Sequence, residues 1–374
     1  MKDNPFIITG LVPRPYFCDR EKESVSIIRT LTGGGNITLI SARRIGKSKL
    51  INFCFEEDTI KKGYYTFYVD LLHTSSIQEL VYAFGKEVFS VLGKRNANFG
   101  KKLVAALSSI SAGFEYDPIT GCPKFSIGLG DIVRPEYTLE EIFSILEKAD
   151  KPCLVAFDEF QQITNYSDKN VEALLRSHIQ RSGNANFVFS GSERHLISEM
   201  FLSSAKPFYN STDIIELKPI AKDKYITFVN FYMKNDGRLI EEKDIDYVYN
   251  LFEGNTYCMQ KVFHQLYSEF PAGTKYTSEN IADVIDSIIE DASDGYARML
   301  SHLTLRQKEF LYAIANEGGR AEKVLSGNFV RKHSLSSQSA VQAACGKLIE
   351  MGLLTKEENA ITIEDHFLRI YLSR

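Results

Sequence analysis

The sequence lacks the features that mark a membrane protein, a secreted protein or a protein that coats nucleic acid. Within its 374 residues, no apolar run approaches the roughly 18 to 20 residues that a membrane span requires. Residues 1–10 also lack the basic-then-apolar layout of a signal peptide. A formal net charge of −4 argues against a protein that mainly coats nucleic acid. We therefore expect a cytoplasmic protein that makes no membrane contact.

Paired cysteines are also missing. The six cysteines stand singly, with no C-x-x-C pair and no histidine nearby at metal-ligand spacing: Cys18, Cys54, Cys122, Cys153, Cys258 and Cys345. This pattern favours reduced thiols that pack in the interior over a zinc site or a disulfide framework. Hydrophobic residues make up 44% of the chain and charged residues 25%, which is typical of a globular protein with two or three domains.

One stretch lies between an apolar run and a helical pattern. Residues 41–48, Ser-Ala-Arg-Arg-Ile-Gly-Lys-Ser, follow the apolar run 37–40 and precede a helical pattern that begins at Lys49. Phosphate-binding loops of the form G-x-x-x-x-G-K-[ST] occupy such a position, because their backbone N–H groups must surround phosphate oxygens at the start of a helix. We therefore predict a nucleotide site formed by Ser41, Ala42, Arg43, Arg44, Ile45, Gly46, Lys47, Ser48 and Lys49.

Three residues at the end of this loop have distinct expected roles. Gly46 permits close approach of the backbone, Lys47 reaches the β- and γ-phosphates as a catalytic cation, and Ser48 holds Mg²⁺ through its hydroxyl. Ser41 stands where the pattern has its first glycine, which usually supports the opening turn. The sequence thus departs from the strict motif at one position and keeps its Gly-Lys-Ser end.

A second stretch supplies two acidic residues. Residues 153–157 are fully apolar and lead into Asp158 and Glu159, as expected of a buried parallel strand that presents carboxylates at its carboxyl end. We expect Asp158 to accept the water shell of Mg²⁺ and Glu159 to polarise the water that attacks the γ-phosphate. A solvated Asp-Glu turn is the alternative, but the pairing with the loop favours the site.

The next strand-like run, 186–189, ends in Ser190-Gly191-Ser192. In a parallel sheet this end lies beside the acidic strand, so Ser190 is a candidate for orienting the attacking water. The alternative is a small-residue turn that starts the helix predicted over 193–200. A last, short strand is expected over 213–217.

The segment ahead of the first helix carries an aromatic residue and an arginine. Phe17 and Arg20 are candidates for the base side of a nucleotide bound at the loop. An alternative with equal support is a simple helix start that is capped by Asp19. The sequence leaves the choice between these two readings open.

The loop, the Asp-Glu strand and the Ser-Gly-Ser strand, in this order, resemble P-loop ATPases of the AAA+ type. The resemblance is closer to the archaeal-type ATPases allied to the STAND signalling NTPases, whose loop Gly-Pro-Arg-Arg-x-Gly-Lys-Thr is similar to residues 41–48. Their aromatic-x-x-Arg-Glu box is similar to Phe17, Arg20 and Glu21. The resemblance implies an α/β fold with a parallel sheet in the order 5-1-4-3-2, ATP with Mg²⁺, a helical lid and a winged helix.

The rest of the sequence fits this layout. We expect the ATPase α/β domain over residues 1–218, with a hairpin inserted at 113–130, the lid over 219–300 and the winged helix over 301–374. The lid should contain four helices, over 221–233, 241–252, 256–270 and 277–299. The segment 254–260 resembles the family's Gly-Asn-Pro-Tyr turn, which implies that Tyr257 and Lys261 face the nucleotide.

Three functions are compatible with these patterns: an ATPase, a nucleotide-gated signalling switch with little hydrolysis, and a DNA-binding regulator. AAA+ rings usually supply an arginine finger after the strand that ends here in Ser190-Gly191-Ser192. In this sequence Arg194 is the only arginine between Ser192 and Asp213. We therefore expect slow hydrolysis. Gln338, Gln342 and Lys347 on the third helix of the winged helix, followed by an acidic wing tip, favour a packing or protein-binding role over DNA contact. Expected partners are ATP and ADP, with DNA, a protein or a second copy left open.

Overall fold

The computed structural model describes residues 4–92, 114–116, 123–125, 129, 132–357 and 359–374. The chain divides into two compact units. The sheet unit comprises Leu11–Arg14 and Arg20–Lys218, and the helical unit comprises Met1–Gly10, Pro15–Asp19 and Pro219–Arg374. The amino-terminal segment thus passes repeatedly from one unit to the other.

The sheet unit contains a five-stranded sheet in the order β2-β5-β6-β1-β7, and all of its strand pairs are parallel. Its strands are β1 (Ile37–Ile40), β2 (Tyr65–Asp70), β5 (Cys153–Asp158), β6 (Ala185–Gly191) and β7 (Asp213–Glu216). Counted along the chain, these five strands lie in the order 2-3-4-1-5, which is the expected order 5-1-4-3-2 read from the opposite edge.

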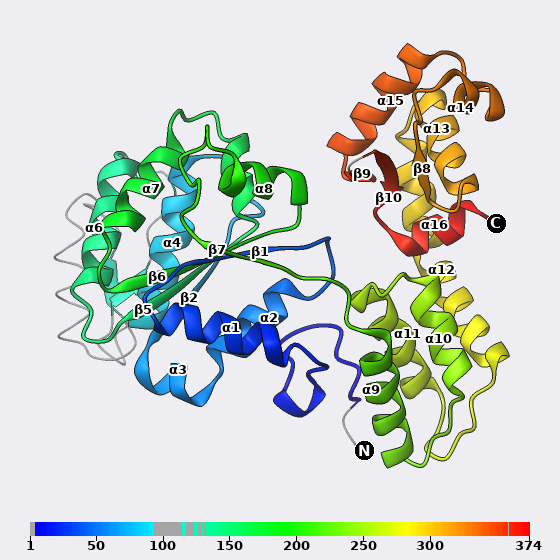
Figure 1. Cartoon of the computed structure of the whole chain (residues 1–374), viewed down its shortest axis with the longest axis horizontal. Helices are drawn as coiled ribbons and strands as arrows, with labels where there is room; N and C mark the ends of the chain where they lie inside the picture. Colours follow the sequence, from blue (N-terminus) through cyan, green and yellow to red (C-terminus); the bar gives the residue numbers. More distant parts are fainter. Residues whose placement is uncertain (1–3, 93–113, 117–122, 126–128, 130–131, 358) are drawn as a thin grey trace. The chain divides into compact units, whose positions relative to one another are not determined.

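Helices cover both faces of this sheet (Figure 1). One face carries α4 (Ile77–Leu92), α6 (Pro135–Glu147), α7 (Val171–Arg181) and α8 (Arg194–Leu202), and the other carries α1 (Glu21–Thr32), α2 (Lys47–Phe55) and α3 (Asp58–Gly63). Every residue of β1 and β5 is buried for this reason, whereas the edge strand β7 is mostly exposed. Two-sided burial explains why these central strands are apolar runs without alternation.

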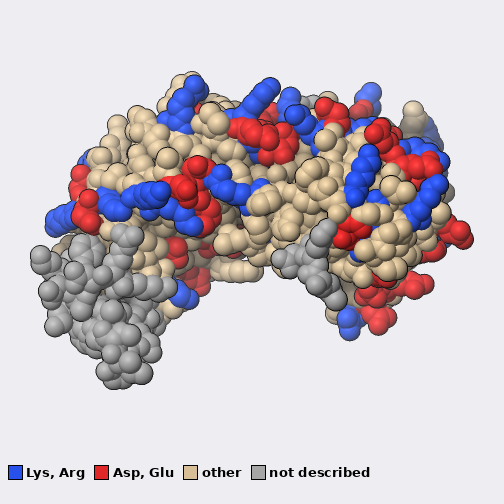
Figure 2. All heavy atoms as spheres, turned by 90° about the horizontal axis from the view of Figure 1, so that it is seen from below, with Lys and Arg blue, Asp and Glu red and all other residues tan. Residues whose placement is uncertain are grey.

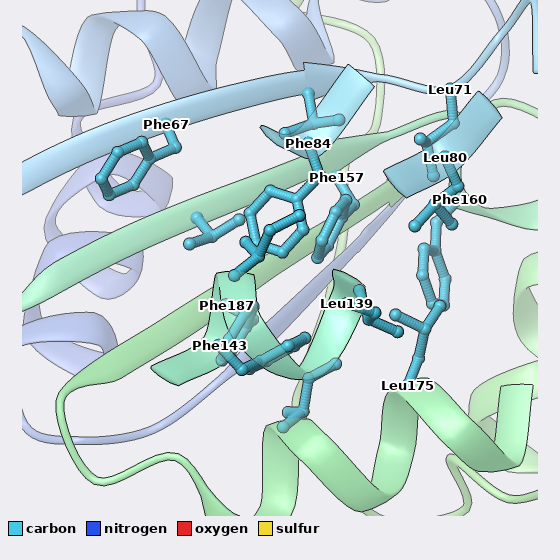
Figure 3. Close-up of a cluster of buried hydrophobic side chains, with 14 of the residues drawn as sticks. Phe67, Leu71, Leu80, Phe84, Leu139, Phe143, Phe157, Phe160, Leu175 and Phe187 are labelled. Atoms are coloured by element: carbon cyan, nitrogen blue, oxygen red, sulfur yellow. The ribbon is translucent and has the colours of Figure 1, made fainter. Parts of the chain in front are cut away.

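Phenylalanines fill the core between the sheet and one helical layer. Figure 3 shows Phe67, Phe157 and Phe187 of the strands in one cluster with Phe84 of α4 and Phe143 of α6. The rings of Phe157 and Phe187 are stacked with 6.3 Å between centroids, and Phe84 meets Phe157 edge-on at 5.1 Å. Such pairs add about 0.5–1.5 kcal/mol each to the free energy of burial. The carboxyl ends of β5 and β6 therefore extend from a closely packed base.

The predicted insertion is described only in part. β3 (Phe114–Tyr116) pairs antiparallel with β4 (Pro123–Phe125), as expected of the two arms of a hairpin. The turn 117–121 between these arms, and the segment 99–109, whose sequence pattern predicts a helix, lie outside the described residues.

Four helices form the first part of the helical unit, close to their predicted positions: α9 (Lys222–Asn235), α10 (Glu242–Leu251), α11 (Thr256–Glu269) and α12 (Ser278–Ser301). Thr277 and Asn280 form a reciprocal capping box that starts α12, and the Asn255 side chain accepts the Cys258 N–H at the start of α11. Their core also contains Phe6, which is fully buried and packs on Phe263 of α11. No sequence pattern predicts that a residue ahead of Pro13 lies in this core.

The winged helix follows with α13 (Leu305–Asn316), α14 (Gly327–Lys332) and α15 (Gln338–Glu350), and it ends in α16 (His366–Leu372). Its sheet has the antiparallel order β8-β10-β9, formed by β8 (Arg320–Glu322), β9 (Leu354–Glu357) and β10 (Ala360–Ile363). The sequence pattern predicts two of these strands, over 352–356 and 360–363, and gives no signal for β8. The sequence pattern predicts the second helix over 323–332, but α14 starts later, because Ser326 caps it by accepting the Phe329 N–H.

Two expected absences can be examined in the described part of the chain. No helix there has the length and the apolar character that crossing a membrane requires. Clusters of three or more His, Cys, Asp or Glu side chains able to bind a metal ion are likewise not found among these residues.

Phe6→Ala should destabilise the helical unit although it lies far in sequence from the helices. Truncation of a buried phenylalanine costs about 3–5 kcal/mol, because the cavity is filled only in part. We expect the urea midpoint of unfolding, followed by far-ultraviolet circular dichroism, to fall clearly. Phe231→Ala is the matched control, because Phe231 is 56% exposed. Equal shifts in the two variants would contradict the packing role of Phe6.

Two buried cysteines should resist alkylation. Burial raises the pKa of Cys54 and of Cys153 to about 12. Since only the thiolate reacts, iodoacetamide at pH 8 should leave both unlabelled in the folded protein and label them after unfolding in urea. Mass spectrometry of tryptic peptides measures this, with the half-buried Cys18 as the comparison. Rapid labelling of Cys54 or Cys153 without denaturant would contradict the prediction.

Candidate nucleotide site

The loop predicted to bind phosphates connects β1 to α2. Helix α2 begins at Lys47, and Gly46 before it has φ 101°, a left-handed conformation that a side chain would strain. Arg44 is also left-handed, with φ 64°. The loop therefore turns sharply at the amino end of a helix, where backbone N–H groups lack helical partners and suit an anion.

Ser41, the departure from the motif, contacts the loop lysine. Its hydroxyl is fully buried and donates to the Ala42 carbonyl at 2.8 Å. It accepts a hydrogen bond from Lys47 Nζ at 3.3 Å. A glycine at position 41 would have no side-chain oxygen. The serine found there therefore gives the Lys47 ammonium a partner inside the loop.

Asp158, at the end of β5, accepts hydrogen bonds from three hydroxyl groups. Ser48 Oγ donates to Oδ2 at 2.6 Å, Tyr68 OH donates to the same oxygen, and Ser190 Oγ donates to Oδ1. The Glu159 N–H also donates to Oδ1, at 3.0 Å. The structure thus brings the two predicted metal-site residues together, and it places Ser190 on Asp158.

Tyr68 is a residue that the sequence analysis missed. It lies on β2 beside Ala156 of β5, and the pleat turns its ring to the face opposite Phe67. Burial, and then the neighbouring Asp158 carboxylate, raise the pKa of Tyr68 far above its ordinary value. The phenol therefore stays protonated and donates its hydrogen bond at neutral pH.

Glu159 has a separate set of partners. Its backbone is left-handed, with φ 52°, and its Oε2 accepts from Gln161 Nε2 and from Ser192 Oγ, both at 2.6 Å. The Ser192 N–H donates to the same oxygen at 3.2 Å. Arg43 Nε of the loop donates to Ser192 Oγ at 3.4 Å. Ser192 was noted only as part of a turn, and Gln161 was missed.

The segment ahead of α1 contradicts one of the two alternatives predicted for it. Asp19 does not cap the helix: Arg20 is the N-cap residue, with φ 79° and no side-chain capping bond. The Arg20 guanidinium is buried, donating to the Lys218 carbonyl at 2.6 Å and pairing with Glu23 at 3.0 Å. Phe17 belongs to the helical unit, so a base-binding role for Phe17 and Arg20 stays a prediction.

Other predicted residues lie on the outer surface of α2 or on the helical unit. Lys49 lines a cavity of about 320 Å³ together with Asn52 and Phe53, and burial lowers the pKa of Lys49. Tyr257 and Lys261 lie on α11, where Lys261 Nζ sits 5.4 Å from the ring centroid of Phe367. Their predicted contact with nucleotide is untested. Arg194 forms an exposed ion pair with Glu216.

A family model described as an ATPase domain predominantly from Archaea matches residues 17–262. The chain belongs to this ATPase family. A second model, described as a probable winged helix domain, matches residues 294–374 of this ATPase. The predicted resemblance to archaeal-type P-loop ATPases with a carboxyl-terminal winged helix is confirmed, and the protein is an ATP-hydrolysing P-loop enzyme.

Solved structures with a similar fold have low sequence identity to this ATPase. The Walker-type ATPase of Pyrococcus abyssi has a TM-score of 0.67 and 18% identity, with 99% of this chain and 100% of that chain covered. The Aeropyrum pernix ORC2 protein, solved as ADPNP–ADP complexes, has a TM-score of 0.62 and 12% identity, with 99% and 95% covered. The Aeropyrum pernix ORC1 protein in complex with DNA has a TM-score of 0.52 and 10% identity, with 96% and 92% covered. No curated protein sequence matches the chain significantly.

Tyr68→Phe should weaken the structure around Asp158. The variant removes one donor to a carboxylate, and such hydrogen bonds contribute about 1.5–3 kcal/mol to the free energy of unfolding. Tyr65→Phe is the matched control on the same strand, because Tyr65 OH donates to the exposed Asp150 at 2.9 Å. We expect the loss in urea unfolding to be larger for Tyr68→Phe. Equal losses would contradict a special role of the Tyr68 hydroxyl.

Proposed function

We propose that this ATPase hydrolyses ATP slowly, with Mg²⁺, and that the loop from Ser41 to Ser48 binds the phosphates. The observation that carries the proposal is the 2.6 Å hydrogen bond from Ser48 Oγ to Asp158 Oδ2. This bond joins the first residues of the helix after the loop to the carboxyl end of the acidic strand. It supports a site in which a hydroxyl and a carboxylate lie beside Lys47 and Glu159, as hydrolysis of ATP requires.

The residues at this position fit Mg²⁺. Ser48 Oγ and Asp158 are oxygen ligands, which this hard cation prefers, and a site with one carboxylate and one hydroxyl leaves room for phosphate oxygens and waters. When bound, Mg²⁺ would neutralise charge on the β- and γ-phosphates. Ser190 and Tyr68 orient the Asp158 carboxylate from the two neighbouring strands.

Lys47 and Glu159 supply the two remaining functions. Lys47 is 5% exposed and points its ammonium at Ser41 inside the loop, so a γ-phosphate there would meet a cation shielded from solvent. Glu159 follows Asp158 directly and accepts its three hydrogen bonds on Oε2. We assign Glu159 as the base that takes a proton from the attacking water.

The small number of arginines after the Ser-Gly-Ser strand supports slow turnover. Arg194 is the only arginine between Ser192 and Asp213, and it pairs with Glu216. An arginine finger contributes about 10³ to 10⁵ in rate, so an enzyme without one in this segment should turn over slowly.

We further propose that nucleotide state changes the arrangement of the lid, over 219–300, and of the winged helix, over 301–374. Support comes from Arg20, which starts α1 and holds the carbonyl of Lys218, the last residue of the sheet unit, at 2.6 Å. A change at the loop can reach this point because α1 packs against α2. A cytoplasmic location belongs to the same proposal.

The DNA-binding alternative has less support. Lys332 pairs with Glu317, which also contacts His333, and Lys347 pairs with Glu350, so these two lysines already have acidic partners. Elsewhere on the chain, the face drawn in Figure 2 also mixes basic and acidic side chains of the described residues. Phosphate binding generally needs a continuous basic area. We therefore favour a protein or packing role for the winged helix.

The proposal is tested by ATP binding and phosphate release with purified protein. Lys47→Ala should lose both, because the β- and γ-phosphates lose their cation. Glu159→Gln should keep ATP affinity near that of the wild type and lower phosphate release by about 10² to 10⁴, the usual contribution of a general base. Omission of Mg²⁺ should abolish release. Lys86→Ala, which changes an exposed lysine of α4, is the control.

Either of two results would contradict this assignment. Turnover that survives in Glu159→Gln would show that another group takes the proton. Absence of ATP binding by the wild type would show that the loop with Ser41 does not hold nucleotide.

A further inference from the structure

Three donors converge on one oxygen of the glutamate that the proposed function makes the base. Gln161 Nε2 and Ser192 Oγ each lie 2.6 Å from Glu159 Oε2, and the Ser192 N–H lies 3.2 Å away. All hydrogen bonds that the described residues make to this carboxylate end on Oε2. Oε1 is therefore the oxygen that can take a proton from water.

Arg43 of the loop determines where the hydroxyl hydrogen of Ser192 points. Arg43 Nε donates to Ser192 Oγ at 3.4 Å, and a guanidinium has donors only. Ser192 Oγ thus accepts from Arg43, and its own hydrogen is directed to Glu159. This contact links the phosphate loop to the glutamate through a single hydroxyl.

Gln161 donates to Glu159 through Nε2 while its own carbonyl oxygen, Oε1, stays without a hydrogen bond among the described residues. Its side chain is 2% exposed. Turning the amide over would set Oε1 against a carboxylate oxygen and would repel it, so Nε2 must face Glu159. A buried carbonyl without a partner destabilises the fold, and such groups tend to mark a functional constraint.

Gly191 keeps this amide in place from the other side. A Cβ at position 191 would lie 2.3 Å from Gln161 Oε1 and 3.2 Å from Ile197 Cδ1. Only glycine leaves the room that the Gln161 amide occupies at the end of β6. Each residue of the Ser-Gly-Ser sequence therefore serves a different neighbour. Ser190 donates to Asp158, Gly191 leaves room for the Gln161 amide, and Ser192 donates to Glu159.

We propose that Gln161 and Ser192 are positioning residues that hold Glu159 Oε2, so that Oε1 faces the attacking water. This inference rests on the proposed function, in which Glu159 is the base. The Glu159 side chain has several rotamers. Three hydrogen-bond donors and the left-handed backbone of this residue select one of them. Misplacing a base by about 1 Å can cost about 10² in rate, which sets the expected size of the effect.

The test measures kcat and the dissociation constant for ATP in Gln161→Met and Ser192→Ala. Each variant should lower kcat by about 10- to 100-fold. In Gln161→Met, whose amide donates to Glu159 and not to the loop, ATP affinity should stay within about twofold. Gln162→Met is the matched control, since Gln162 lies on the same 3-10 helix, η3 (Phe160–Asn165), and donates to the Thr74 carbonyl instead. Gly191→Ala should act like Gln161→Met, by displacing the amide.

A second measurement distinguishes positioning from general damage. In a Glu159→Gln background, Ser192→Ala and Gln161→Met should lower the residual rate no further, because their effect acts through Glu159. A kcat that is unchanged or raised in both single variants would overturn the inference, as would an equal loss in the Glu159→Gln background. If instead Glu159→Gln itself turns over like the wild type, the proposed function fails and the inference fails with it.

Discussion

The site depends on one carboxylate at the end of one strand. Asp158 accepts hydroxyl donors from the loop helix, from β2 and from β6, so its two oxygens connect three neighbouring parts of the sheet unit. Parallel strands make this possible, because their carboxyl ends meet at one edge. Hydrogen bonds to a charged group are roughly twice as strong as neutral ones, which helps to fix these elements against one another.

Much of this arrangement could be predicted from the sequence, because the signals are local. The Gly-Lys-Ser end of the loop and the Asp-Glu pair lie at the ends of apolar runs, and the helices of the helical unit follow apolar periodicity. Tyr68 and Ser192 could not be assigned, because their roles depend on which strands are neighbours. Nothing in a single strand reveals that Tyr68 lies opposite Ala156.

Other errors have equally specific causes. β8 has three residues, too few for an alternating pattern to be recognised, and it forms only because β10 provides a partner. Asp19 is a residue type that favours helix starts, yet the left-handed backbone at Arg20 places the start of the helix one residue later. Left-handed residues cost on the order of 1–3 kcal/mol each. At Arg44 and Glu159 this cost falls on the site itself, and at Glu159 three hydrogen bonds to the carboxylate help to offset it.

The route of the amino-terminal segment determines how the protein can be divided into modules. Residues 1–10 and 15–19 belong to the same unit as residues 219–374, and Phe6 lies in its core. A chimera that joins residues 219–374 alone to another nucleotide-binding domain would lack a part of its own interior. Recombination, whether in evolution or in the laboratory, must therefore exchange this unit as discontinuous pieces, so a single crossover cannot transfer it intact.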